Sequence, residues 1–251
     1  MGAVNYSGLK AEALLRTAVK FGLAPAQAHI MMTKQISSHA MQTFDADCRR
    51  CDRLARFLDQ VRQDYPTYHA RPVPAFGDPS PRLLIVGLAP GMHGANRSGR
   101  PFTGDYAGIL LYETLHRYGF ASAPESKAAD DGLVLSGCRI TNAVKCLPPA
   151  NKPEGREVAQ CNSYLASELA ALPHDAVILA LGNVAHAAVL KALSLKAGSY
   201  RFSHGARHDL PNGRRLYDSY HCSRYNTQTR RLTEAMFHAV FAAIVHDLKG
   251  D

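Results

Sequence analysis

Short, uninterrupted apolar segments alternate with longer helical patterns through most of the chain. Residues 83–87 read Leu-Leu-Ile-Val-Gly, which is typical of a strand buried on both faces. Similar runs recur at 139–144, 176–180 and 216–220, and apolar residues at helical spacing occupy 109–118, 157–172, 184–193 and 232–248. This order predicts βαβ units, a parallel sheet and helices on both of its faces.

The first part of the chain follows a different pattern. Apolar residues at helical spacing over 9–21, and a proline at 25 suited to the first turn of a second helix, predict a helical extension over residues 1–45. A third helical stretch starts at Asp47, and the proline-rich segment 66–81 predicts a linking loop. We therefore expect the main domain to span residues 46–251.

Charge and cysteine content narrow the class of protein. A formal charge of +8 makes a polyanionic partner plausible, although net charge says nothing about the fold. No apolar stretch is long enough for a membrane span, and charged residues between Lys10 and Lys20 interrupt any secretory signal. We therefore expect a cytoplasmic, nucleoid-associated monomer of bacterial type, in which six cysteines are more naturally metal ligands or buried thiols than disulfides.

Three loops follow predicted strands and carry the polar side chains of most interest. The first reads GLAPGMHGANRSGRPFTGD over 87–105, the second TNAVKCLPPANKP over 141–153, and the third HCSRYNTQT over 221–229. Active sites in parallel α/β folds lie beyond the carboxyl ends of the strands. The glycine-rich first loop matches neither a dinucleotide fingerprint nor a P-loop, and from the sequence alone Asn142 is equally suited to capping a turn.

Together these loops resemble the uracil-DNA glycosylase superfamily, and specifically its iron–sulfur family 5, the type B enzymes. The resemblance covers roughly residues 46–248, and the first loop is its most specific part. It implies a three-layer αβα fold around a central four-stranded parallel sheet, a pocket for a flipped base, and hydrolysis of the N-glycosidic bond. It also implies a broad pocket that accepts other deaminated or damaged bases.

Four cysteines agree with this resemblance. It implies a [4Fe–4S] cluster held by Cys48, Cys51, Cys146 and Cys161, whereas Cys138 and Cys222 are expected to be non-ligands. Four thiolates suit iron–sulfur or structural zinc equally well, and spacing alone does not decide between them. Cys161 also lies on the apolar face of its helix, where a core position is the competing interpretation.

The resemblance and the chemistry of base excision together assign the site residues. The backbone of Gly87, Leu88 and Ala89 lines the pocket, Phe102 stacks on the base, Asn142 reads its edge, and His221 donates a hydrogen bond to a uracil carbonyl oxygen. Asp105, the nearest carboxylate, is assigned to orient water and to offset positive charge on the sugar, and its competing interpretation is a helix N-cap. The residues expected to contact DNA phosphates are Arg97, Arg100, Lys145, Lys152, Arg224 and Arg230.

The sequence also departs from the family pattern. Leu88 stands where family 4 has a glutamate, Cys222 replaces a proline after the motif histidine, and Arg230 replaces a glycine. Two alternatives therefore stay open: a non-catalytic iron–sulfur protein that binds DNA, and a nucleotide-binding α/β enzyme of flavodoxin type. No lysine is implied as a nucleophile, so the expected enzyme is a monofunctional uracil-DNA glycosylase acting on damaged DNA.

Overall fold

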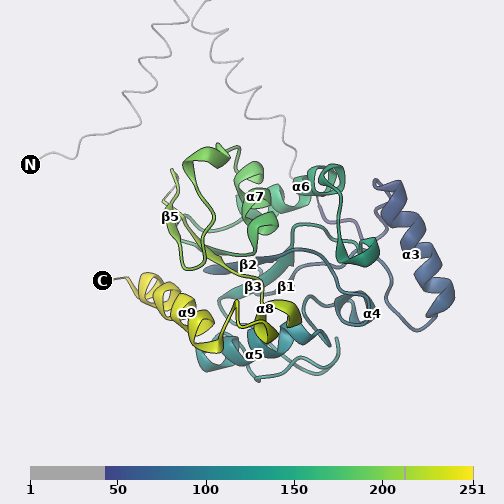
Figure 1. The fold of residues 1–251 in the computed structure, drawn as a ribbon, viewed down its shortest axis with the longest axis horizontal. Coiled ribbons are helices and arrows are strands. Elements are labelled where there is room, and N and C mark those ends of the chain that lie inside the picture. The colour runs from purple at the N-terminus through teal and green to yellow at the C-terminus, as the bar shows by residue number, and fades with distance from the viewer. Residues whose placement is uncertain (1–42, 212, 251) are drawn as a thin grey trace, which may run out of the picture. The chain divides into compact units, whose positions relative to one another are not determined.

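Parallel strands form the centre of the computed structural model, which describes residues 43–211 and 213–250 (Figure 1). The six-stranded sheet has the order β1-β3-β2-β4-β6-β5. Its four inner strands are parallel, and they are β3 (Cys138–Asn142), β2 (Leu83–Gly87), β4 (Val177–Leu181) and β6 (Arg215–Ser219). This confirms the predicted parallel core. The helical extension predicted for residues 1–45 lies outside the described residues except for its last three positions.

Two short edge strands were not predicted. β1 (Phe76–Gly77) pairs antiparallel with β3, and β5 (Arg207–Asp209) pairs antiparallel with β6. Two or three residues are too few to show the alternation that identifies a strand. β5 is also polar throughout, which suits the edge of a sheet.

Helices cover both faces of the sheet and make the predicted three-layer architecture (Figure 1). α5 (Tyr106–Arg117) and α9 (Glu234–Lys249) pack on one face, where Leu111 and Phe241 belong to the same buried cluster as Ile85 and Leu179. α6 (Gly155–Ala170) and α7 (Asn183–Ala192) pack on the other face. Because β2 and β4 are buried on both faces, their sequences are continuous apolar runs.

One further helix and four short elements complete the fold of the described residues. α3 (Asp52–Asp64) packs through Leu54, Leu58 and Val61 against the loop that follows β3. The other short elements are α4 (Ala95–Ser98), α8 (Arg224–Gln228), η1 (Pro149–Asn151) and η2 (Ala197–Ser199). α4 lies within the first motif loop and α8 within the third.

A buried ion pair fixes the loop after β3 to α6. The Lys145 side chain is 1% exposed, and its Nζ lies 2.8 and 2.9 Å from the two carboxylate oxygens of Glu168. The same Nζ donates to the hydroxyl of Thr141 on β3. Such a pair adds little relative to an apolar contact, but removing one partner leaves a buried charge without compensation.

We predict that Glu168→Ala lowers the free energy of unfolding by about 3 to 5 kcal/mol, because the Lys145 ammonium loses its buried partner. Denaturant unfolding followed by circular dichroism measures the change. The matched control is Glu113→Ala, which removes an exposed glutamate on α5. A Glu168→Ala variant as stable as the control would contradict the prediction, and the double variant Lys145→Met with Glu168→Leu is expected to recover most of the loss.

Candidate active site and cysteine cavity

A pocket of about 500 Å³ opens at the carboxyl ends of the parallel strands. All three motif loops contribute to it, as the strand order requires. Of the residues predicted from the sequence, those lining the pocket are Leu88, Ala89, Phe102, Asp105, Asn142, His221 and Arg224. The structure therefore brings together side chains that lie more than 130 positions apart in the chain.

The Asp105 carboxylate packs closely against glycines of the first loop. Its Oδ2 accepts a hydrogen bond of 3.0 Å from the backbone N–H of Ala95. A Cβ atom placed on Gly94 would lie 1.9 Å from the carboxylate, so this close approach requires glycine. Asp105 occupies the N-cap position of α5, but its side chain makes no capping hydrogen bond there. The carboxylate points to the pocket and the first loop instead.

Burial raises the pKa of the Asp105 carboxyl group. The Ala95 amide and the charges of Arg97 and His93 act in the opposite direction without cancelling the effect of burial. A carboxylate with a raised pKa is a stronger base than one in water, which suits it to orient and activate a water molecule.

Asn142 and Phe102 both approach the backbone of Gly87. A Cβ on Gly87 would lie 2.4 Å from Asn142 Oδ1 and 2.8 Å from the Phe102 ring. Within the described part of the chain, Asn142 Oδ1 is buried and has no hydrogen-bond partner. A buried amide oxygen without a partner is costly, so its presence at a pocket wall points to a polar ligand.

Phe102 and His221 form the aromatic wall of the pocket. Their ring centroids lie 5.8 Å apart with an interplanar angle of 24°. The φ angle of Phe102 is 58°, a left-handed conformation that is rare for a bulky residue. Burial lowers the pKa of His221 to about 4. The imidazole is therefore neutral at pH 7 and can donate one hydrogen bond without carrying a charge.

Two of the six expected phosphate contacts need correction. Lys145 is buried and held by Glu168, and Arg100 is buried and lies 2.6 Å from Asp131. Neither side chain faces solvent, so the expectation that they contact phosphate is wrong. Their counterions, Glu168 and Asp131, lie 23 and 31 positions away in sequence, so no local sequence pattern predicts these ion pairs.

The other four basic side chains, Arg97, Lys152, Arg224 and Arg230, are exposed. Arg224 lies at the pocket mouth, with its guanidinium 4.9 Å from the centroid of the Tyr106 ring. Sequence reasoning missed several pocket residues, among them Tyr106, Asn151, Asn183 and Val184. For Asn183 and Val184, the signal in the sequence was their position at the junction of β4 and α7. The structure gives Gly182, at that junction, a φ of 95°.

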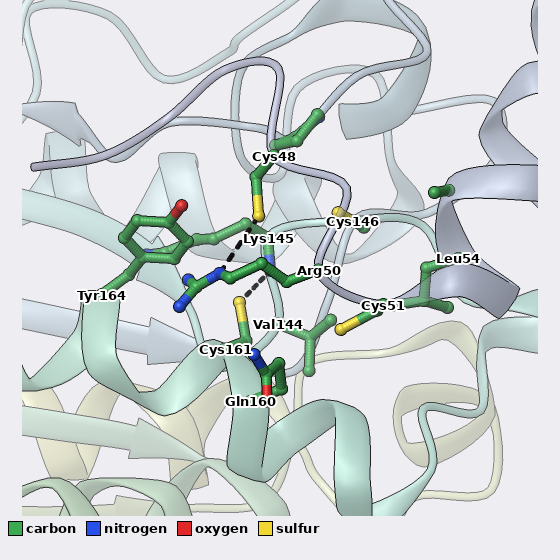
Figure 2. Close-up of a pocket in the computed structure, with 12 residues that line it drawn as sticks. Cys48, Arg50, Cys51, Leu54, Val144, Lys145, Cys146, Gln160, Cys161 and Tyr164 are labelled. Carbon is green, nitrogen blue, oxygen red and sulfur yellow. Dashed lines mark hydrogen bonds between the residues drawn. The ribbon is translucent and has the colours of Figure 1, made fainter. Parts of the chain in front are cut away.

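Four cysteines face one small cavity away from this pocket (Figure 2). They are Cys48 and Cys51 at the start of α3, Cys146 in the loop after β3, and Cys161 on α6. Figure 2 shows their sulfur atoms pointing toward a common space. Cys138 and Cys222 are buried and do not line it.

The chemistry of this donor set fits a soft metal ion or a metal–sulfur cluster. Burial and the neighbouring thiol of Cys161 raise the pKa of Cys51 to about 11, and burial raises the pKa values of Cys146 and Cys161. Four thiols gathered in one buried cavity repel one another once ionised, and a bound cation removes that repulsion. The cavity therefore offers four ligands to iron–sulfur or to zinc.

A second polar cluster lies between α7, β5 and β6. The buried carboxylate of Asp218 contacts His186 Nδ1 at 2.8 Å and His208 Nε2 at 3.1 Å, each through a different oxygen. His186 Nε2 lies 3.0 Å from the carbonyl oxygen of Tyr200. Two acceptors thus face His186, and one added proton satisfies both of them.

Comparisons with known proteins agree with this geometry. A family model described as the uracil DNA glycosylase superfamily matches residues 74–248. The chain is 48% identical over 202 residues to a type-5 uracil-DNA glycosylase of Thermus thermophilus, covering 78% of this chain and 91% of that protein. A Mycobacterium leprae protein of the same name is 44% identical over 203 residues, covering 77% of this chain and 88% of that protein.

A more distant relative is also similar over a smaller part of the chain. A type-4 uracil-DNA glycosylase of Archaeoglobus fulgidus is 34% identical over 139 residues, which is 55% of this chain and 56% of that protein. Within residues 43–211 and 213–250, no helix is long and apolar enough to cross a membrane.

The cluster around Asp218 predicts a pH-dependent contribution to stability. Burial lowers the pKa of His186, but the hydrogen bond and charge of Asp218 outweigh it and raise the pKa above its ordinary value. A raised folded-state pKa stabilises the protein fully below the unfolded value of about 6.5 and loses that effect as pH rises through the folded value. The decrease in Tm caused by Asp218→Asn should therefore be largest near pH 6. The difference in Tm between the parent and the variant should become smaller toward pH 9.

Thermal unfolding across this range, with the exposed Asp130→Asn as control, measures the effect. A difference in Tm between the parent and Asp218→Asn that does not change with pH would contradict it.

Proposed function

The chain belongs to the uracil-DNA glycosylase superfamily, and we propose that it hydrolyses the N-glycosidic bond of uracil in DNA and leaves an abasic site. The observation that carries this proposal is the pocket itself, in which the unpartnered oxygen of Asn142, the neutral ring of His221 and the half-buried carboxylate of Asp105 line one cavity. The type-5 relatives, which are named uracil-DNA glycosylases, support it.

Each side chain has a role set by its chemistry. A base that has left the duplex stacks on Phe102 and hydrogen-bonds the Asn142 amide, which offers both a donor and an acceptor. Breaking the glycosidic bond places negative charge on the base and positive charge on the sugar. The N–H of His221 stabilises the first, and the Asp105 carboxylate stabilises the second and directs a water molecule at the sugar.

Hydrolysis is favoured over a lyase reaction because none of the lysines in the described part of the chain lines the pocket. Lys145, the lysine closest in sequence to Asn142, is held by Glu168. A volume of about 500 Å³ also leaves room for bases larger than uracil, so we include other deaminated or damaged bases among the substrates. Exposed Arg97, Lys152, Arg224 and Arg230 are proposed to contact phosphates.

We further propose that Cys48, Cys51, Cys146 and Cys161 hold a [4Fe–4S] cluster. When bound, such a cluster would supply structural cross-linking rather than a reacting group, because the cavity does not share lining residues with the active-site pocket. The four thiols would then join α3, the loop after β3 and α6.

The test of the proposed function is direct. Purified protein is incubated with a duplex carrying one uracil, and the product is treated with alkali. Strand cleavage at the uracil position supports glycosylase activity, whereas uncleaved DNA that still binds the protein supports the non-catalytic alternative.

We predict that Asp105→Asn reduces the single-turnover rate of uracil excision by about 10² or more, as expected for loss of a general base. Asparagine can still accept the Ala95 hydrogen bond and is a comparable N-cap, so the fold, the DNA binding and the metal content should be retained. Asp130→Asn is the control for loss of an exposed negative charge. Excision by Asp105→Asn at the parental rate would refute the assignment of Asp105.

The cysteine proposal predicts a brown protein with absorbance near 400 nm and about four irons per chain. Cys146→Ser should lose iron and stability together, because the bound metal contributes to folding. Cys138→Ala, at a cysteine outside the cavity, should keep its iron and serves as control. A colourless protein with one zinc ion per chain would overturn the iron–sulfur assignment but leave the four ligands in place.

A further inference from the structure

The pairing of strand β6 with its neighbours ends just before His221, which lines the pocket. The parallel pairing of β4 with β6 ends at Leu181 and Ser219, and the pairing with β5 ends at Tyr217. The backbone N–H of Tyr220 is therefore beyond the ladder. It donates instead to a side chain, Nδ1 of His204, at 3.2 Å.

His204 holds this segment through its ring as well as through its nitrogen. The His204 and Tyr220 rings are stacked, with centroids 5.0 Å apart and planes inclined by 19°. The guanidinium of Arg231 lies 4.7 Å from the same tyrosine ring. Ser219 Oγ lies 3.4 Å from His204 Nδ1 and donates a hydrogen bond of 2.9 Å to the Tyr220 carbonyl oxygen.

The backbone carbonyl of His221 itself is also held by a side chain. Asn226 Nδ2 donates to the carbonyl oxygen of His221 at 2.8 Å. His204 and Asn226 therefore bracket His221, one at the preceding amide and one at its own carbonyl. A ring that must donate to a small, developing charge needs a backbone held in one conformation.

We propose that His204 is a positioning residue for His221. This inference rests on the proposed excision reaction, since it assigns His204 a role in that reaction without contact with the substrate. Because Nδ1 accepts the Tyr220 N–H, His204 is the neutral tautomer with its proton on Nε2.

The surroundings of His204 support the neutral form. Tyr220 and Ser219 face it from the end of β6, and the Met236 backbone faces it from α9. Within the described residues no carboxylate forms an ion pair with its ring, and the charge closest in the stack is the cation of Arg231. Burial lowers the pKa of His204. Protonation in acid would replace the acceptor by a second donor facing the Tyr220 N–H.

Two substitutions separate the hydrogen bond from the stack. His204→Phe keeps an aromatic ring against Tyr220 but removes the acceptor, and His204→Asn keeps an acceptor oxygen near the Nδ1 position and loses the ring. At pH 7.5 we expect single-turnover uracil excision to fall about tenfold in His204→Phe, from loss of one hydrogen bond. His204→Asn should stay within about threefold of the parent, and its intact mass checks that the new amide has not hydrolysed. His174→Ala, at an exposed histidine, is the control.

The pH profile tests positioning against a purely structural role. Asp105 and His221 are present in both the parent and His204→Asn, so their titration cancels when the two rates are divided. The ratio of parent to His204→Asn should fall as the pH drops through the His204 pKa, because only the parent loses its acceptor. A constant ratio, or a His204→Phe rate within about twofold of the parent, would overturn the proposal.

Hydrogen exchange of the peptide 217–224 separates this proposal from the proposed function. Protection should be lost in His204→Phe and kept in His204→Asn, whether or not the protein excises uracil. If the parent excises no uracil, the proposed function fails while the exchange data still test the contact. Equal protection in all variants would show that the contact of His204 with Tyr220 does not hold this segment, even if the enzyme is active.

Discussion

The pairing of β2 with β3 places Gly87 directly opposite Asn142, and the pocket depends on that register. The two side chains that would clash with a Cβ at position 87 are Asn142 and Phe102, and both line the pocket. A parallel sheet brings the ends of β2, β3, β4 and β6 to one edge, so loops from distant parts of the chain meet there. The absence of a side chain at Gly87 lets Asn142 and Phe102 pack closely against the end of β2, and both of them line the pocket.

The protonation equilibria of two pocket residues differ from those of the same groups in water. Burial raises the pKa of Asp105 and lowers the pKa of His221, so neither group is in its ordinary state. A pocket that must receive a departing anionic base gains from a neutral donor, because a permanent cation would bind phosphate as readily as the transition state. Under the proposed function, the exposed Arg224 at the pocket mouth would attract the DNA backbone without entering the reaction.

Much of this could be predicted from the sequence, for physical reasons. The central strands β2 and β4 are recognisable because burial on both faces requires continuous apolar runs, and the first motif loop begins where β2 ends. β1 and β5 could not be predicted, since their few residues pair only because a neighbouring strand is present. Lys145 and Arg100 were assigned to phosphate because a sequence shows their charge but not the carboxylates that bury them. Nor could it show that Asp105 turns its side chain to Ala95 instead of capping α5.

The loop after β3 connects the two sites that the chain builds. Asn142 ends the strand at the pocket, and Cys146 enters the cysteine cavity four residues later. Between them, Lys145 is fixed to Glu168, and its backbone N–H donates to Cys161 Sγ at 3.3 Å. The cysteine cavity and the Lys145 ion pair therefore anchor the same short segment to α6. A displacement of α6 or of its cysteines would reach Asn142 through this segment, so under the proposed function a metal centre held by the four thiols would help to determine where the Asn142 amide lies.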